Sequence, residues 1–209
     1  MDTSAAYSTE TERRILQAAT DIFLLKGRDG ARMQEIADKA GINKAMLHYY
    51  FRSKDKLYEQ VFIVQLEQFF TGLLDAIPET DDVHAFLEHF IDSYMDSMAA
   101  NEGLVRFIIW EIQSGAHLMP AFIQTMFSKR GYRKPLFLVK IEQAIDKGQM
   151  RNVEPVNFVI SLIGLCAYPF IARPVLEKVL GGLSISSTEF LAQRKTEILQ
   201  LIWNGIRPE

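Results

Sequence analysis

The segment NKAMLHYYFRSKDKL, from Asn43 to Leu57, gathers side chains that suit binding more than catalysis. Three aromatic rings stand side by side at 49–51, and the cations Arg52, Lys54 and Lys56 follow at once. A core helix spaces its large apolar side chains by three or four positions, so three adjacent rings cannot all face inward. Rings and cations this close together suit a surface that meets a polyanion.

Histidines and carboxylates elsewhere in the chain are the other residues that could do chemistry, as metal ligands or in proton transfer: His84, His89, His117, Asp81, Asp82, Glu88 and Asp92. Their spacings match no metal-ligand set, and the chain has neither a phosphate loop nor a nucleophile elbow. His89 and Asp92 form an ordinary helical pair. We therefore expect no enzyme, no catalytic residue, no cofactor and no metal site.

Composition describes an ordinary globular chain. Its 209 residues allow one or two domains, and 48% apolar with 23% charged residues argues against extensive disorder. The single cysteine, Cys166, excludes an intrachain disulfide and fits a reducing cytosol. No signal peptide is evident, and the most apolar run, 156–172, is interrupted by polar residues and Pro169, so we expect a buried helix and no membrane span. The expected location is cytoplasmic.

Charge is unevenly distributed along the chain, whose net charge is −3. Residues 1–57 hold 10 Lys or Arg and 8 Asp or Glu, whereas the remainder holds 13 and 18. A polyanionic partner should therefore meet the N-terminal part.

The apolar periodicity is helical throughout and shows no strand alternation. We expect an all-α protein of about nine helices, with a break or kink at 128–135. We expect a small basic head, residues 1–53 with 1–8 disordered, and a larger apolar body, residues 54–209.

Residues 33–51 follow the helix-turn-helix pattern, counted in twenty positions from Met33. Ala37 is fifth and small because two helices cross there, and Gly41 is ninth and takes the turn with positive φ. Apolar residues that fix the angle between the helices occupy the fourth, tenth and fifteenth positions: Ile36, Ile42 and Leu47. Few unrelated chains meet all these constraints in order.

The head resembles the DNA-binding domain of the TetR (tetracycline-repressor-like) family from about Thr9 to Val61. The matching pieces are RRILQAATDIFLLKG and IADKAGINKAMLHYYFRSKDKLYEQV. The resemblance implies a bacterial, ligand-responsive transcriptional regulator, a repressor by default, that binds a palindromic double-stranded operator as a homodimer. It also implies that the head binds DNA and that the body binds the ligand and dimerises. An activator, or a helical sensor with weak or lost DNA binding, remains an alternative.

The DNA contacts implied by the resemblance lie in and around the second helix of the motif: Arg32, Gln34, Lys44, Ala45, Met46, His48, Tyr49, Tyr50 and Lys54. Leu47 and Phe51, four apart, should face inward, and Tyr50 should be half-buried between the inner and outer faces. The family's usual SKGTLYYHF reads NKAMLHYYF here. Asn43 can still cap the helix, whereas Ala45, Met46 and His48 stand in place of Gly, Thr and Tyr. Arg32 replaces a capping Thr or Ser.

Two further surfaces are expected in the body. The last two helices should form the dimer contact, with residues Phe158, Leu162, Leu165, Cys166, Ile198 and Ile202. Aromatic residues could line a cavity for a small apolar or aromatic effector: Phe86, Phe90, Tyr94, Phe107, Trp110, Phe122, Met126 and Tyr168. We hypothesise that the effector changes the spacing of the two fourth helices and so releases the operator.

Overall fold

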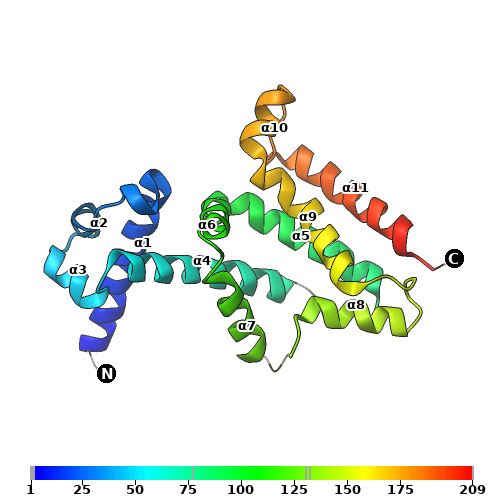
Figure 1. Ribbon diagram of the computed structural model, residues 1–209, viewed down its shortest axis with the longest axis horizontal. Helices are drawn as coiled ribbons and strands as arrows, with labels where there is room; N and C mark the ends of the chain where they lie inside the picture. Colours follow the sequence, from blue (N-terminus) through cyan, green and yellow to red (C-terminus); the bar gives the residue numbers. More distant parts are fainter. Residues whose placement is uncertain (1–2, 77, 130, 132, 209) are drawn as a thin grey trace. The chain divides into compact units, whose positions relative to one another are not determined.

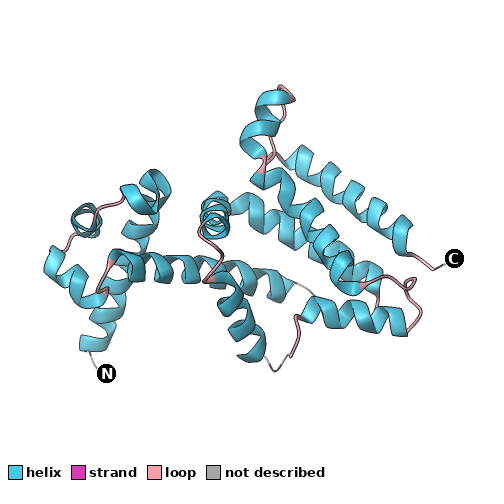
Figure 2. Ribbon diagram, in the orientation of Figure 1, coloured by secondary structure: helices cyan, strands magenta, loops and turns pink. Residues whose placement is uncertain are grey.

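The computed structural model describes residues 3–76, 78–129, 131 and 133–208, and every regular element in them is an α-helix (Figure 2). The helices are α1 (Thr3–Gly30), α2 (Met33–Ala40), α3 (Lys44–Tyr50), α4 (Lys54–Ala76), α5 (Val83–Ala100), α6 (Glu102–Gln113), α7 (Met119–Lys129), α8 (Leu136–Asp146), α9 (Pro155–Ile171), α10 (Arg173–Val179) and α11 (Thr188–Ile206). The predicted all-α class is confirmed.

The described residues contain two helices more than the expected nine, because two long segments are each divided. The sequence predicts the first division, between α7 and α8, where Pro135 precedes α8. It does not predict the second, at Ala172, where α9 and α10 meet at 67°. Pro174 lies in the first turn of α10, where its missing N–H costs nothing and its fixed φ suits a new helix.

The chain folds as two compact units, residues 1–67 and 68–209, and α4 begins in the first and continues into the second. In the first unit α1, α2 and α3 surround a small core with the start of α4 (Figure 1). Its fully buried large side chains come from all four helices: Ile15, Phe23, Ile36, Leu47, Leu57, Phe62 and Leu66. α1 begins at Thr3, so residues 3–8 are helical where we expected disorder, while Met1 and Asp2 lie outside the described residues.

The second unit packs α5 against α9 and α11 (Figure 1). α5 buries a stripe spaced by three and four residues, the arrangement that places one face of a helix on the core: Val83, Phe86, Leu87, Phe90, Ile91, Met95 and Met98. Of the described helices, none alone is long and apolar enough to cross a membrane; α9 and α10 together reach that length and composition only across their 67° bend.

Candidate nucleic-acid interface

The turn between α2 and α3 is built by Gly41, whose φ of 67° and ψ of 36° place it in the left-handed region. The Gly41 and Ile42 amides donate to the carbonyls of Asp38 and Ala37, at 3.1 and 3.0 Å, which closes α2. Arg14 of α1 donates from Nε to the Ala40 carbonyl at 3.2 Å and also from Nη2. The positive φ favours glycine at position 41, and a Cβ there would lie 3.3 Å from Arg14 Nη2 and displace that guanidinium slightly.

The helix α3 starts at the predicted cap, because the Asn43 side chain accepts a hydrogen bond from the Met46 amide at 2.7 Å. Its inner side is set by Leu47, which is fully buried, and by Phe51, the buried residue that ends the helix. These two residues confirm the predicted inward face. α2 lacks such a cap, since Arg32 makes no side-chain capping bond.

The outer face of α3 carries the residues predicted to meet DNA. Lys44, Ala45 and His48 are exposed, Met46 is 42% exposed and Tyr49 is 84% exposed. Tyr50 is half-buried, as expected, and its ring meets that of Tyr49 edge to face at 5.6 Å. The fold therefore brings five of the predicted contact residues onto one solvent-facing surface. Arg32 and Gln34 are exposed at the start of α2.

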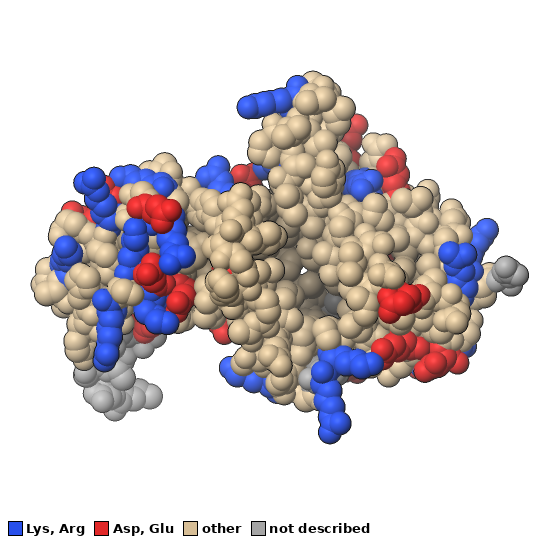
Figure 3. Space-filling model, viewed as in Figure 1, with Lys and Arg blue, Asp and Glu red and all other residues tan. Residues whose placement is uncertain are grey.

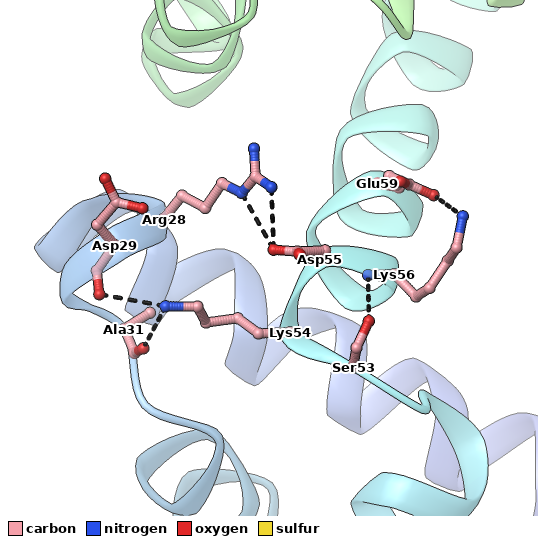
Figure 4. A network of polar contacts seen from close by, with 8 residues as sticks. All are labelled: Arg28, Asp29, Ala31, Ser53, Lys54, Asp55, Lys56 and Glu59. Atoms are coloured by element: carbon pink, nitrogen blue, oxygen red, sulfur yellow. Dashed lines mark hydrogen bonds and ion pairs between the residues drawn. The ribbon is translucent and has the colours of Figure 1, made fainter. Parts of the chain in front are cut away.

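Lys54 lies at the start of α4 but points to the end of α1 (Figure 4). Its Nζ donates to the carbonyl oxygens of Asp29 and Ala31, at 3.2 and 3.3 Å. Next to it, Arg28 pairs with Asp55 at 2.9 Å. Lys54 therefore fastens α4 to the α1–α2 connection, a structural role that the sequence does not reveal.

Most other cations of this unit are neutralised by carboxylates. Arg13, Lys26, Arg28, Lys39 and Lys56 form ion pairs at 2.6–2.9 Å, and the hydrogen bond from Lys26 lowers the pKa of Glu35. On the face drawn in Figure 3, blue and red side chains accordingly interleave over this unit. In the described part of the chain, Arg32, Lys44 and Arg52 pair with no carboxylate. The cations without a partner thus flank α2 and α3, where phosphates would have to be met.

Comparison with known proteins agrees with this geometry. Residues 15–61 match the model of the family described as bacterial regulatory proteins, tetR family. The chain is 26% identical over 200 residues to the HTH-type transcriptional regulator RutR of Escherichia coli K12, which covers 94% of this chain and 91% of RutR. It is 27% identical to the HTH-type transcriptional repressor SCO4008 of Streptomyces coelicolor, over 87% and 88% of the two chains.

The fold agrees over the full length. The crystal structure of a TetR-family transcriptional regulator from Mesorhizobium loti superposes with a TM-score of 0.68 at 21% identity, covering 99% of this chain and 100% of that one. Residues 15–61 thus form a DNA-binding domain of the TetR family. The protein is a transcriptional regulator, and the helix-turn-helix described above is the part that matches the family model.

The body of the chain places most of the predicted pocket residues at buried or half-buried positions. Phe86, Phe90 and Phe107 are buried, and Tyr94, Trp110, Phe122 and Met126 are half-buried. Ring-to-ring contacts of 4.4–6.0 Å join four of the predicted pocket residues to three further rings. The four are Phe86, Phe90, Tyr94 and Phe122, and the three are Phe69, Phe70 and Phe137. We call these seven residues the ring cluster.

Tyr168 corrects the prediction, because it is 59% exposed on the outer side of α9. It lies two positions after the buried Cys166, and two residues carry a helix about 200° round its axis. Tyr168 instead lines an open, mostly apolar groove of about 630 Å³ with Gly164, Ile171 and Arg194.

The predicted dimer contacts also need correction. Phe158, Leu162, Cys166 and Ile198 are buried within the chain, so they pack its own core, while Leu165 and Ile202 are half-buried. The large apolar side chains that α9 and α11 expose are different ones: Val156, Ile160, Ile163, Tyr168, Ile171 and Leu201. The predicted helices carry an exposed apolar surface, but on the opposite face.

The structure brings His84, Glu88 and Asp92 into one open groove of about 560 Å³ between α5 and α11. The His84 ring lies edge-on to Trp203 at 4.7 Å, and Lys195 pairs with Asp96 at 2.7 Å. Among the described residues no three His, Cys, Asp or Glu side chains are placed to hold a metal ion.

Glu111 is a buried carboxylate that the sequence does not explain. It accepts hydrogen bonds from the backbone amides of Leu118 and Met119, where α7 begins. A carboxylate at this position satisfies amides that have no partner inside the helix. Glu111 is thus a cap supplied from the preceding helix, and only the folded chain brings the two together.

Proposed function

We propose that the protein binds a palindromic DNA operator as a homodimer through residues 33–51. Lys44, Ala45, Met46, His48 and Tyr49 would enter the major groove on the outer face of α3. Arg32, Gln34, Tyr50 and Lys54 would contact bases or phosphates beside it. Two such heads one helical turn apart, about 34–36 Å, would read two half-sites. The protein would act in the cytoplasm, where the DNA is, and would need no catalytic residue for this role.

The observation that carries the proposal is the division of α3 into two faces. Leu47 and Phe51 pack inward, so the exposed residues between them are held on a rigid support. The Met46 side chain is apolar and suits a thymine methyl, while Lys44 and His48 suit phosphate or base acceptors. The Lys54 Nζ already serves two carbonyls, so its phosphate contact would have to be shared with them.

Selection of bound sequences from a random DNA pool tests the proposal and reports both palindromy and half-site spacing. Affinity for the selected sequence should fall steeply with salt, because phosphate contacts release counterions. Lys44→Ala and His48→Ala should each weaken that binding, by roughly 5- to 30-fold for a contact of about 1–2 kcal/mol.

Lys56→Ala is the matched control, because Lys56 is exposed but paired with Glu59 at 2.6 Å. It should change affinity little, and all three variants should unfold at the temperature of the parent. Unchanged binding in both Lys44→Ala and His48→Ala would mean that α3 does not present the reading face.

The dimer would form through the exposed apolar faces of α9 and α11. Monomeric proteins rarely leave large apolar patches in water, whereas the interfaces of homodimers are rich in apolar side chains. Ile160 and Leu201 are the most useful probes, since they are 64% and 63% exposed in the single chain.

The effector would be a small apolar or aromatic molecule bound within the ring cluster, and its binding would release the operator. The cluster joins the second half of α4 to α5, α7 and α8 through ring contacts, and α4 is continuous with the DNA-binding unit. A ligand that favours one position of α4 can therefore shift DNA affinity. The related SCO4008 is named a repressor, which supports repression in the absence of ligand.

Titration of small aromatic and aliphatic compounds against an operator-bound sample tests this part. A compound of the right shape should lower operator affinity, and Phe90→Ala should abolish its effect. A compound that binds the cluster without altering operator affinity would contradict the proposed coupling.

A further inference from the structure

Gln34 and Asp38 form a hydrogen-bonded pair on the exposed surface of α2. The Gln34 Nε2 donates to Asp38 Oδ1 at 2.7 Å, one helical turn further on. A carboxylate can only accept, so this bond fixes which way the amide is turned. The Gln34 nitrogen faces Asp38, which leaves one N–H and the carbonyl oxygen free for another partner.

One donor and one acceptor side by side complement a single base edge in the major groove. Adenine offers an N6 donor next to the N7 acceptor, guanine offers two acceptors, cytosine a donor alone and thymine an acceptor and a methyl group. We propose that Gln34 reads an adenine in each half-site and that Asp38 is the positioning residue that holds its amide for this purpose. The inference rests on the proposed DNA-binding function.

The charge of Asp38 supports a role in selectivity. Neighbouring acids are neutralised, Glu35 by Lys26 and Asp55 by Arg28. Within the described residues Asp38 forms no ion pair, and its side-chain bond is the one to Gln34. A carboxylate left unneutralised on a DNA-facing surface repels phosphate. Asp38 should therefore lower affinity for all DNA while it raises the preference for adenine, and these two effects can be separated.

A glutamine–acid pair four residues apart also stabilises a helix slightly without any part in recognition. α1 offers a comparable pair, where Gln17 Nε2 donates to Asp21 Oδ1 at 3.1 Å. Asp21 also pairs with Lys39 of α2 at 2.9 Å, so the glutamine is the residue to replace and the aspartate is kept. Replacement of Gln17 measures what the loss of such a pair does on its own.

The experiment selects DNA from a random pool with the full chain and with Gln34→Ala, Asp38→Ala, Gln34→Lys and Gln17→Ala. The parent should select adenine at one symmetric position of each half-site. Gln34→Ala should lose that preference, roughly 5- to 150-fold in relative affinity, as for a bidentate base contact. Gln34→Lys should prefer guanine there, because an ammonium group only donates.

Asp38→Ala tests whether Asp38 positions the Gln34 amide or only stabilises α2. It should lower the adenine preference about 2- to 5-fold while it tightens binding to unselected DNA, since it removes both the hydrogen bond and the charge. Gln17→Ala should leave the selected sequence unchanged. If Gln34→Ala binds too weakly for selection, Asp38→Ala and Gln34→Lys still report the base preference.

Two results would overturn the inference: a palindrome in which Gln34→Ala and Gln34→Lys alter no position, or an Asp38→Ala protein that keeps the full adenine preference. Failure of the parent to select any palindrome would instead contradict the proposed function. The two failures are therefore distinguishable.

Discussion

The outer faces of α3 and α9 both turn large side chains to solvent, but they differ in what stands between those side chains. On α3, Met46 and Tyr49 alternate with Lys44 and His48, so apolar contact and charge occur on the same surface. On α9, Ile160, Ile163 and Ile171 are separated by small residues and by the ring of Tyr168. A mixed surface suits a polar, charged groove, and an aliphatic one suits another apolar surface.

The difference shows why exposure alone does not describe a binding site. α3 must hold its side chains in fixed positions on a helix of seven residues, and it does so with one buried leucine, one cap and one turn glycine. α9 has seventeen residues and needs only that its outer side remain apolar. Substitutions in α3 should therefore change operator binding and the stability of the first unit, whereas substitutions on the outer face of α9 should change dimerisation.

The largest effect is expected for Leu47→Ala. Leu47 is fully buried, and its truncation should lower the free energy of unfolding of the first unit by about 2–5 kcal/mol through lost burial and a cavity. Thermal unfolding followed by circular dichroism measures the loss, and operator binding should fall with it. Dimerisation, measured by sedimentation, should be unaffected. Loss of the dimer in Leu47→Ala would contradict the assignment of DNA binding to α3 and of dimerisation to α9.

Leu201→Glu and Ile160→Glu should have the opposite pattern. Each puts a carboxylate into the proposed apolar contact, twice in a symmetric dimer, and should weaken dimerisation by about 100-fold or more without unfolding the chain. Sedimentation equilibrium measures this. Leu25→Glu is the matched control, since Leu25 is 76% exposed on α1 in the other unit. Dimers as tight as the parent in both variants would place the interface elsewhere.

Asn43→Ala sharpens the account of α3 at a smaller scale. Loss of the bond from the Met46 amide should cost about 1 kcal/mol, since alanine cannot cap the helix. Operator affinity should fall because the reading face frays, while Asn43→Ser should restore most of both losses. Chemical denaturation and a binding titration give the two numbers. Full operator affinity in Asn43→Ala would show that the cap does not order the face.

The prediction with the smallest effect on stability compares the reactivity of thiols on the inner and outer sides of α9. Burial raises the pKa of the Cys166 thiol to about 12, so at pH 8 it is protonated as well as inaccessible. N-ethylmaleimide should not label the native protein and should label it in denaturant. Ser161→Cys in a Cys166→Ser background puts a thiol on the exposed side of α9. This thiol should react readily with N-ethylmaleimide, and it should react more slowly in the dimer. Rapid labelling of native Cys166 would reverse the assignment of faces.

The helix-turn-helix could be predicted in detail because its constraints are local. Gly41 is favoured by a positive φ, Asn43 by the Met46 amide that needs an acceptor at the start of α3, and Leu47 by its spacing from the turn. Such requirements involve residues a few positions apart, so the order of residue types is enough to state them. The placement of each was confirmed, whereas their contacts with DNA stay a prediction.

The face of α9 could not be predicted because this helix is apolar almost all round, and periodicity then identifies no inner side. The sequence offers Phe158 and Leu162 as readily as Ile160 and Ile163. Only the packing of α5 and α8 against α9 decides which of them are buried.

Polar contacts between residues far apart in the sequence could not be predicted either. Arg14 reaches the turn from 26 residues away, Lys54 binds carbonyls 23 and 25 residues earlier, and Glu111 caps a helix that begins eight residues later. The sequence by itself determined the helices, the turn and the outward set of α3, since these depend on backbone conformation and short spacings. The tertiary structure alone decided the buried side of α9 and the partners of these charges, because burial and ion pairing depend on which distant segments come together.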